Sequence, residues 1–140
     1  GPLMNLGDVT SASVPKITLA APPRDGGALS TRTLIPHRVH DAIGVLGAVS
    51  VATAALLDGT PANTVLEPAV RAAAAAGGEV VVAVEHPTGT FDAALAVAVG
   101  PGGPDVVSAG IIRTARRLFD GVVYPRPPAA SPTASTGASR

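Results

Sequence analysis

Cysteine is absent from this 140-residue sequence, and aromatic and charged residues are scarce. Without cysteine, disulfides, thiolate metal ligands and a cysteine nucleophile are excluded within the chain. Charged residues make up 14% of it, well below the usual quarter or so, and the formal net charge is zero. One short basic run stands at 113–117, so nucleic-acid binding is not predicted.

Aromatic residues amount to 2% of the chain, and alanine, valine, glycine and proline take much of the rest. A core of alanine and valine buries little apolar area per residue. We therefore expect the domain to depend on a partner surface, as a homo-oligomer or with a second chain, rather than to form a stable monomer. No signal-peptide pattern is found at the start of the sequence, so the cytoplasm is the predicted location.

A helix at about 41–57 is the segment around which the fold is predicted to form. It carries no charge from Ala42 to Leu57, and small or apolar residues occupy every side of its helical wheel. A helix that is apolar all round is expected to be buried all round. A membrane-spanning helix needs about 20 apolar residues, whereas this run is bounded by Asp41 and Asp58, so no membrane crossing is predicted. Its small residues would admit strands closely, which favours a sheet wrapped around one central helix.

Apolar alternation and turn residues predict the other elements. Strands are expected near 16–20, 28–35, 79–86, 90–98 and 105–114, with a short last strand at 122–124. In the first of these, Lys16 and Thr18 share one face. An alanine-rich helical stretch begins after Thr60, is divided by Pro68 and ends at Gly77. The fold class is α+β, with a domain at 1–125 and a disordered tail at 126–140 that is rich in Pro, Ala, Ser and Thr.

The entrance to the central helix is a predicted anion site. His37, Arg38 and His40 precede it, and we expect them to converge with the unpaired N–H groups of its first turn. Asp41 is the expected N-cap. Imidazoles gain charge in mildly acidic solution, so a carboxylate ligand is expected to bind more tightly there.

Several motifs together resemble the PrpF-type isomerases, which include methylaconitate isomerases and, closest in these motifs, oxalomesaconate tautomerases. Each motif is weak alone, and as a group they are specific. The resemblance covers roughly residues 1–124. The motifs are Ser13-Val14-Pro15-Lys16, the turn at 22–27, Ile35 to His40 leading into the helical run to Ala54, His86-Pro87-Thr88-Gly89, and 113–121.

The resemblance implies the fold of diaminopimelate epimerase. That fold has two similar halves, each a sheet curled around a central helix, with the active site in the cleft between them. This chain resembles the C-terminal half only. The resemblance therefore implies a partner chain or a second copy that completes the cleft.

The chemistry implied by the resemblance is an allylic proton shift in a small unsaturated di- or tricarboxylate, with no cofactor and no metal. Related epimerases use a cysteine from each half, whereas Val39 stands at this entrance. The resemblance points to Lys16, His40 and His37 as catalytic candidates. The candidates for substrate binding are Arg38, Ser50, His86, Thr88 and Gly89.

A second function of a different class stays open at this point. The chain can be a catalytically silent domain of the same fold that serves ligand binding or oligomerisation. The absent thiol and the absent second half favour that alternative, whereas a neighbouring chain that completes the cleft would favour the enzyme.

Overall fold

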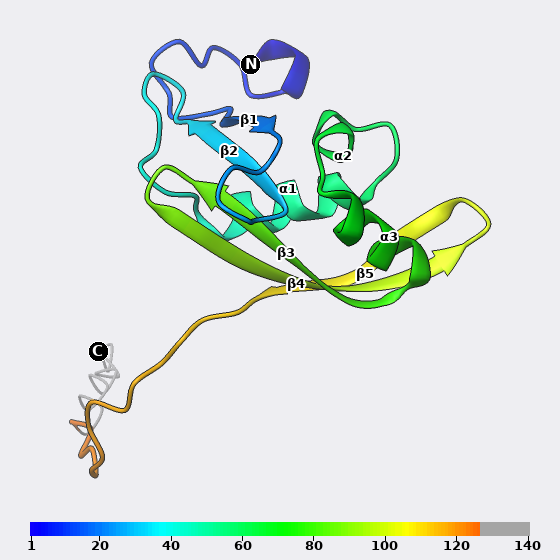
Figure 1. Ribbon diagram of the computed structural model, residues 1–140. Helices are drawn as coiled ribbons and strands as arrows, with labels where there is room; N and C mark the ends of the chain where they lie inside the picture. The colour runs from blue at the N-terminus through cyan, green and yellow to red at the C-terminus, as the bar shows by residue number, and fades with distance from the viewer. Residues whose placement is uncertain (127–140) are drawn as a thin grey trace, which may run out of the picture.

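Alternating apolar side chains build a five-stranded sheet in residues 1–126, the part of the chain described by the structure, a computed structural model. The strands lie in sequence order, and every neighbouring pair is antiparallel except β2 and β3, which are parallel. The predicted α+β class with a mixed, mostly antiparallel sheet is confirmed (Figure 1). The strands are β1 (Ile17–Ala21), β2 (Leu29–Leu34), β3 (Gly78–His86), β4 (Gly89–Gly100) and β5 (Gly103–Ile111).

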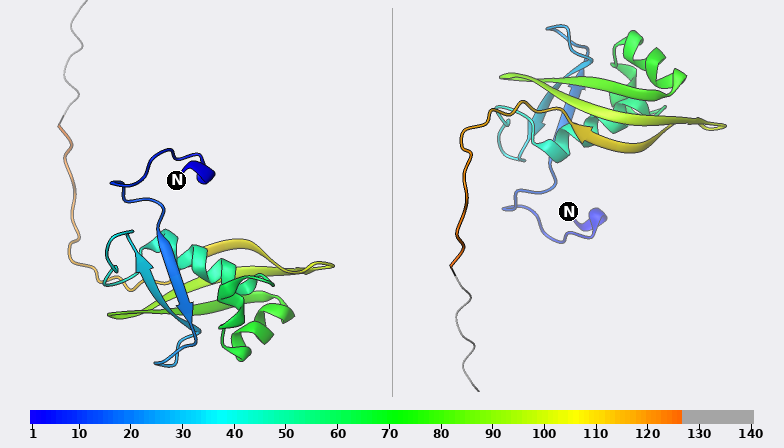
Figure 2. Two further views of the ribbon diagram at one scale, coloured as in Figure 1. Left: turned by 90° about the horizontal axis from the view of Figure 1, so that it is seen from above. Right: turned by 90° about the horizontal axis from the view of Figure 1, so that it is seen from below.

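The central helix, α1 (Val45–Leu56), packs against β3, β4 and β5 in the hollow of the curled sheet (Figure 2). Its buried residues form one stripe, made of Ala48, Ala52, Ala55 and Leu56. Leu46 is 82% exposed, so the predicted burial on all sides is wrong. The sheet covers one face of the helix and leaves the opposite face open.

The helix also begins later than predicted. Gly44 is the N-cap residue and Val45 is the first helical residue, whereas the sequence favoured Asp41 as the cap. The reason is local, because the His40 ring nitrogen Nδ1 accepts the backbone N–H of Ala42 at 3.0 Å and holds these residues in a turn.

The second helical region begins, divides and ends at the residues that the sequence predicted. Helices α2 (Pro61–Thr64) and α3 (Pro68–Ala76) are separate, and Pro68 opens the second of them. The Thr60 side chain caps α2 by accepting the N–H of Asn63 at 3.1 Å. Gly77 follows α3 at a φ of 77°, which favours glycine.

The core lies between the helices and the sheet. Its largest fully buried apolar side chains are Leu29, Leu56, Val82, Val84 and Leu95. Much of the remaining core is alanine, as the composition predicted. None of the helices in residues 1–126 has the length and apolar character that crossing a membrane would require.

A buried carboxylate, which the sequence analysis did not single out, organises the turn between β1 and β2. Glu85 is 3% exposed, and its Oε1 accepts the N–H groups of Arg24, Asp25 and Gly27 at 3.1, 2.7 and 2.8 Å. Its Oε2 accepts the Arg24 N–H at 2.8 Å. Burial by itself would raise the pKa of Glu85, but the hydrogen bonds from these three N–H groups outweigh it and hold that pKa below its ordinary value.

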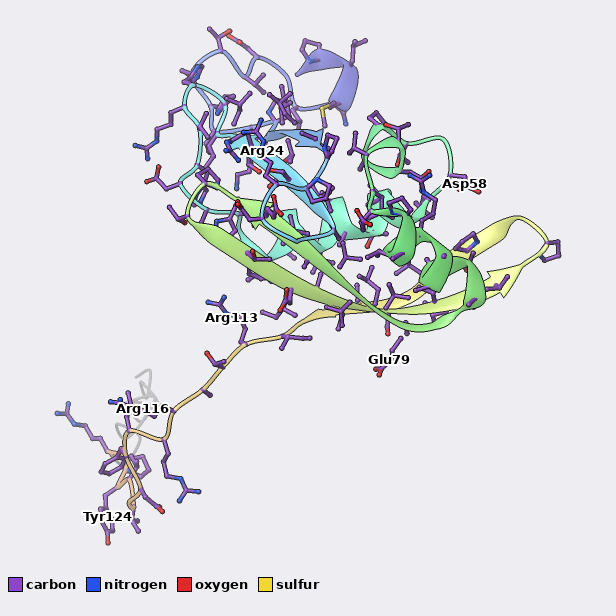
Figure 3. The ribbon with its side chains drawn as sticks, viewed as in Figure 1. Arg24, Asp58, Glu79, Arg113, Arg116 and Tyr124 are labelled. Carbon is purple, nitrogen blue, oxygen red and sulfur yellow. The ribbon has the colours of Figure 1, made fainter. Side chains whose placement is uncertain are left out.

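The two ends of the described chain lie outside the sheet. A short 3-10 helix, η1 (Pro2–Met4), stands at the start. Residues 112–126 run away from β5 in extended form, carrying Arg116 and Tyr124 (Figure 3). The predicted strand at 122–124 is therefore wrong, because residues 122–124 pair with no strand among residues 1–126. Most of the predicted tail, 127–140, lies outside the described residues, and the domain boundary at 125 stays a prediction.

Candidate functional site

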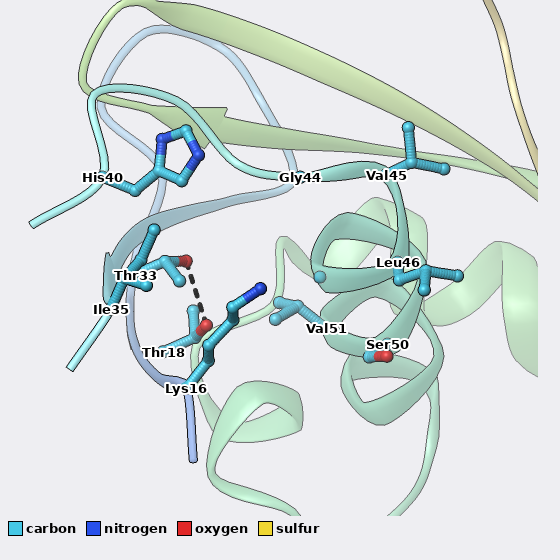
Figure 4. Close-up of a pocket in the computed structure, with 11 residues that line it drawn as sticks. Lys16, Thr18, Thr33, Ile35, His40, Gly44, Val45, Leu46, Ser50 and Val51 are labelled. Atoms are coloured by element: carbon cyan, nitrogen blue, oxygen red, sulfur yellow. Dashed lines mark hydrogen bonds between the residues drawn. The ribbon is translucent and has the colours of Figure 1, made fainter. Parts of the chain in front are cut away.

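A cavity of about 550 Å³ lies between the β1–β2 hairpin and the N-terminal half of α1 (Figure 4). Its lining combines hydroxyl, ammonium and imidazole groups with apolar side chains and glycine backbone. This volume is in the range of small-molecule sites. The lining residues are Lys16, Thr18, Thr33, Ile35, His40, Gly44, Val45, Leu46, Gly47, Ser50 and Val51.

The hairpin supplies the first wall of this cavity. Thr18 and Thr33 are directly opposite in the β1–β2 register, and their hydroxyl oxygens are 3.0 Å apart. Lys16 immediately precedes β1 and lines the same cavity, so it shares a face with Thr18 as predicted. Figure 4 shows its side chain extending from the hairpin toward α1.

A tight loop brings His40 back to the hairpin. The Ile35 N–H donates to the Arg38 carbonyl at 2.9 Å, and the His40 N–H donates to the Thr33 carbonyl at 2.7 Å. These bonds place His40 beside Thr33 on the cavity wall. Because Nδ1 accepts the Ala42 N–H, the neutral ring carries its proton on Nε2. Figure 4 shows Nε2 on the side of the ring that faces α1.

The first turns of α1 supply the opposite wall. Gly44 to Gly47 line the cavity, and the first N–H groups of a helix have no carbonyl partner within the helix. Ser50 lies one turn further along and also lines it. The positive end of the helix dipole therefore faces the same space as Lys16 and His40.

The structure separates the other residues of the predicted entrance. His37 and Arg38 are exposed at the tip of the loop and do not line the cavity. Of the three residues expected to converge on the first turn of α1, His40 alone lines this cavity. The hydrogen bond from the Ile35 N–H to the Arg38 carbonyl closes a tight loop, and His37 and Arg38 lie on its exposed side.

The turn between β3 and β4 lies beside the site and not in it. His86, Thr88 and Gly89 do not line the cavity. The Thr88 hydroxyl instead donates to the Asp41 carbonyl at 2.8 Å, on the loop that carries His40. Burial, and then the neighbouring His40, lower the pKa of the His86 imidazole.

In chemical terms, each polar side chain of the cavity can donate a hydrogen bond. Ammonium, imidazole Nε2–H, hydroxyl and helix N–H groups line it, and its lining contains no carboxylate in the part of the chain described. Such a set stabilises negative charge on a ligand. No three His, Cys, Asp or Glu side chains within residues 1–126 gather closely enough to hold a metal ion.

Sequence reasoning missed Thr18, Thr33 and the glycines of α1 as cavity residues. A signal existed in each case. Gly47, Ser50 and Val51 recur at the three- and four-residue spacing of one helix face. Thr18 and Thr33 lie on strands that the sequence already paired as a hairpin.

The fold is a curled α+β sheet, and the candidate site is a cavity between its β1–β2 hairpin and α1. Comparison with known sequences places this chain in a family. It belongs to the PrpF family, whose description, PrpF protein, it matches over residues 4–126.

Several named relatives share this similarity. The chain is 54% identical over 124 residues to a (4E)-oxalomesaconate Delta-isomerase from Novosphingobium sp. (strain KA1), covering 89% of this chain and 32% of that protein. It is 47% identical over 123 residues to a 4-oxalomesaconate tautomerase from Pseudomonas putida, covering 88% and 31%. A putative isomerase, YbhH, from Escherichia coli (strain K12) is 34% identical over 126 residues, covering 89% and 33%.

A solved structure supports the fold. The crystal structure of methylitaconate-delta-isomerase superposes with a TM-score of 0.50 at 19% identity, covering 84% of this chain and 34% of that one. The chain thus spans about a third of the length of the proteins it matches.

Proposed function

We propose that this chain forms one wall of a cleft in which a small unsaturated di- or tricarboxylate undergoes an allylic proton shift without a cofactor. The observation that carries the proposal is the convergence of Lys16, His40 and the first turn of α1 on one cavity. Relatives named as isomerases and tautomerases support the reaction class.

The residues of this wall suit the anionic side of that reaction. A base removes a proton from the carbon next to the conjugated system, the double bond moves, and an acid returns a proton at the far carbon. Lys16 and His40 Nε2–H hold the substrate carboxylates and the charge of the dienolate. Each hydrogen bond to a charged group contributes about 1.5–3 kcal/mol. Because donors line this wall, we assign the proton-removing base to the opposite wall.

The opposite wall comes from a partner chain or a second copy, with residues 1–125 acting as the C-terminal half. The open face of α1 supports this arrangement, since Val45 and Leu46 are 47% and 82% exposed. Exposed apolar side chains that gather in one patch mark a surface that another protein covers. We place the assembly in the cytoplasm.

The remaining predicted residues take secondary roles in this proposal. Ser50 binds a substrate carboxylate from the floor of the cavity. His37 and Arg38 act from the rim, where their exposed side chains attract an anion. His86, Thr88 and Gly89 lie behind His40, so any part they take in binding is indirect.

A second candidate is a catalytically silent domain that keeps the fold for ligand binding or oligomerisation. The observation that favours it is the lining of the cavity, which contains no carboxylate among residues 1–126 that could act as a base. The two candidates agree on an anion site and differ on proton transfer.

Deuterium incorporation decides between these two functions. The full chain is mixed with the remainder of the 4-oxalomesaconate tautomerase relative, and 4-oxalomesaconate is followed by NMR in D₂O. We expect deuterium to enter in the mixture and not with the chain alone. Lys16→Gln and His40→Gln should each slow it at least about tenfold, while Glu79→Gln on the exposed side of β3 should not. A mixture that binds citrate and transfers no deuterium would favour the silent domain.

A further inference from the structure

The loop that carries His40 is tied to a distant turn of the sheet. The Thr88 hydroxyl donates to the Asp41 carbonyl at 2.8 Å across 47 positions of sequence. Among residues 1–126 this is the side-chain hydrogen bond that reaches residues 41–44 from another element. The stretch between His40 and the start of α1 therefore has one tertiary polar anchor.

We propose that Thr88 and His86 are positioning residues for His40, with the β3–β4 turn clamping the loop that carries His40 against the cavity. The contacts form a series. The Thr88 N–H donates to His86 Nδ1 at 3.3 Å, and the Thr88 hydroxyl holds Asp41. The Ala42 N–H on the same loop holds the His40 ring at 3.0 Å. Loss of the Thr88 hydroxyl would free the segment that fixes the orientation of the His40 ring.

His86 belongs to this series through its ring nitrogen and its place beside His40. Burial and the neighbouring His40 keep its pKa low, so its Nδ1 is an acceptor at neutral pH. A proton on His86 would remove that acceptor and add repulsion against His40. The other titratable groups on the strands and the loop around the pair are Lys16, Arg32, His37, Arg38, Asp41, Glu79, Glu85 and Asp92. Of these, Glu85 is turned to the 24–27 turn.

This proposal rests on the proposed function only in assuming that His40 takes part in the reaction. The clamp itself is measurable in the full chain without substrate. Its readout is hydrogen exchange of the Ala42 amide, whose proton is held by His40 Nδ1.

The test compares Thr88→Val with Thr90→Val, a matched change at an exposed position two residues later, at the start of β4. We expect Ala42 exchange to be about three- to tenfold faster in Thr88→Val, from the loss of one ordinary hydrogen bond. Thr88→Ser, which keeps the hydroxyl, should restore the original rate. Equal rates in Thr88→Val and Thr90→Val would overturn the clamp. Faster exchange of core amides such as Val82 by the same factor would also overturn it, because the effect would then be global.

A second arm tests the imidazole pair. His40→Gln should raise the NMR titration midpoint of His86, and an unchanged midpoint would overturn the electrostatic coupling between the two imidazoles. Citrate binding to the unmodified chain distinguishes failure of the clamp from failure of the proposed function. If Thr88→Val alters Ala42 exchange but the unmodified chain binds no citrate, the clamp stands and the proposed function fails. If the unmodified chain binds citrate and exchange is unaffected, the function stands and the clamp fails.

Discussion

Glu85→Gln is the substitution for which the structure gives the clearest energetic expectation. The carboxylate accepts four hydrogen bonds from the backbone N–H groups of Arg24, Asp25 and Gly27 while 3% exposed. Glutamine keeps one acceptor oxygen, loses the charge and turns an N–H₂ group toward the Arg24 N–H. The weakened bonds and one unsatisfied donor together cost about 2–4 kcal/mol of unfolding free energy.

Urea unfolding followed by circular dichroism measures this loss. The low pKa of Glu85 means that its contribution is present above the ordinary glutamate pKa and disappears as pH falls through the lowered folded value. The original chain should therefore lose stability in acid, while Glu85→Gln should lose less. Glu79→Gln, an exposed position on the same strand, should change the unfolding free energy by less than about 0.5 kcal/mol. Equal effects of the two variants would refute the reasoning.

Three further predictions concern stability. Gly27→Ala should cost about 1–3 kcal/mol in urea unfolding, because its Cβ would lie 2.6 Å from Glu85 Cγ and 2.9 Å from the Ala83 carbonyl. The melting temperature should fall as pH drops below about 6.5, because the pKa of His86 is lowered in the folded chain and the unfolded chain binds the proton more readily. His86→Gln should reduce this fall. An unchanged dependence of melting temperature on pH would contradict the prediction. Leu56→Ala should lower the free energy of unfolding by about 2–5 kcal/mol, because Leu56 is 2% exposed. Leu46→Ser should lower it by less than about 0.5 kcal/mol, because Leu46 is 82% exposed. Similar losses for the two variants in urea unfolding would mean that the open face of α1 is packed.

Much of the fold was predictable because its signals are local. Thr60 caps α2, Pro68 opens α3 and Gly77 ends it, and each effect depends only on residues within about one helical turn. The β1–β2 and β3–β4 hairpins follow from short turns between apolar runs. The burial of α1 could not be read from its composition, since an apolar helix can be covered by its own domain or by a partner.

The candidate site was predictable in part. The resemblance pointed to Lys16, the position of His40 before the central helix marked it, and the structure brings both to one cavity. The orientation of His37 and Arg38 depends on the backbone hydrogen bond that closes the loop at 35–38. No local sequence pattern predicted that bond. Glu85 was missed because its partners lie about 60 positions away in sequence. Long-range polar contacts of this kind leave no periodic signal.

The central claim is that Lys16, His40 and the first turn of α1 form one anion site. Lys16 is the single lysine of the chain, so reductive ¹³C-methylation labels it and the terminal amine while keeping the charge. On citrate titration, the Lys16 methyl signal and the amides of 45–47 should shift with one shared Kd. His40→Gln should weaken that Kd about 10- to 100-fold. Arg116→Gln, on the extended segment away from the cavity, should leave it unchanged (Figure 3). A Lys16 signal that does not move, or that follows a Kd different from that of the α1 amides, would contradict the account.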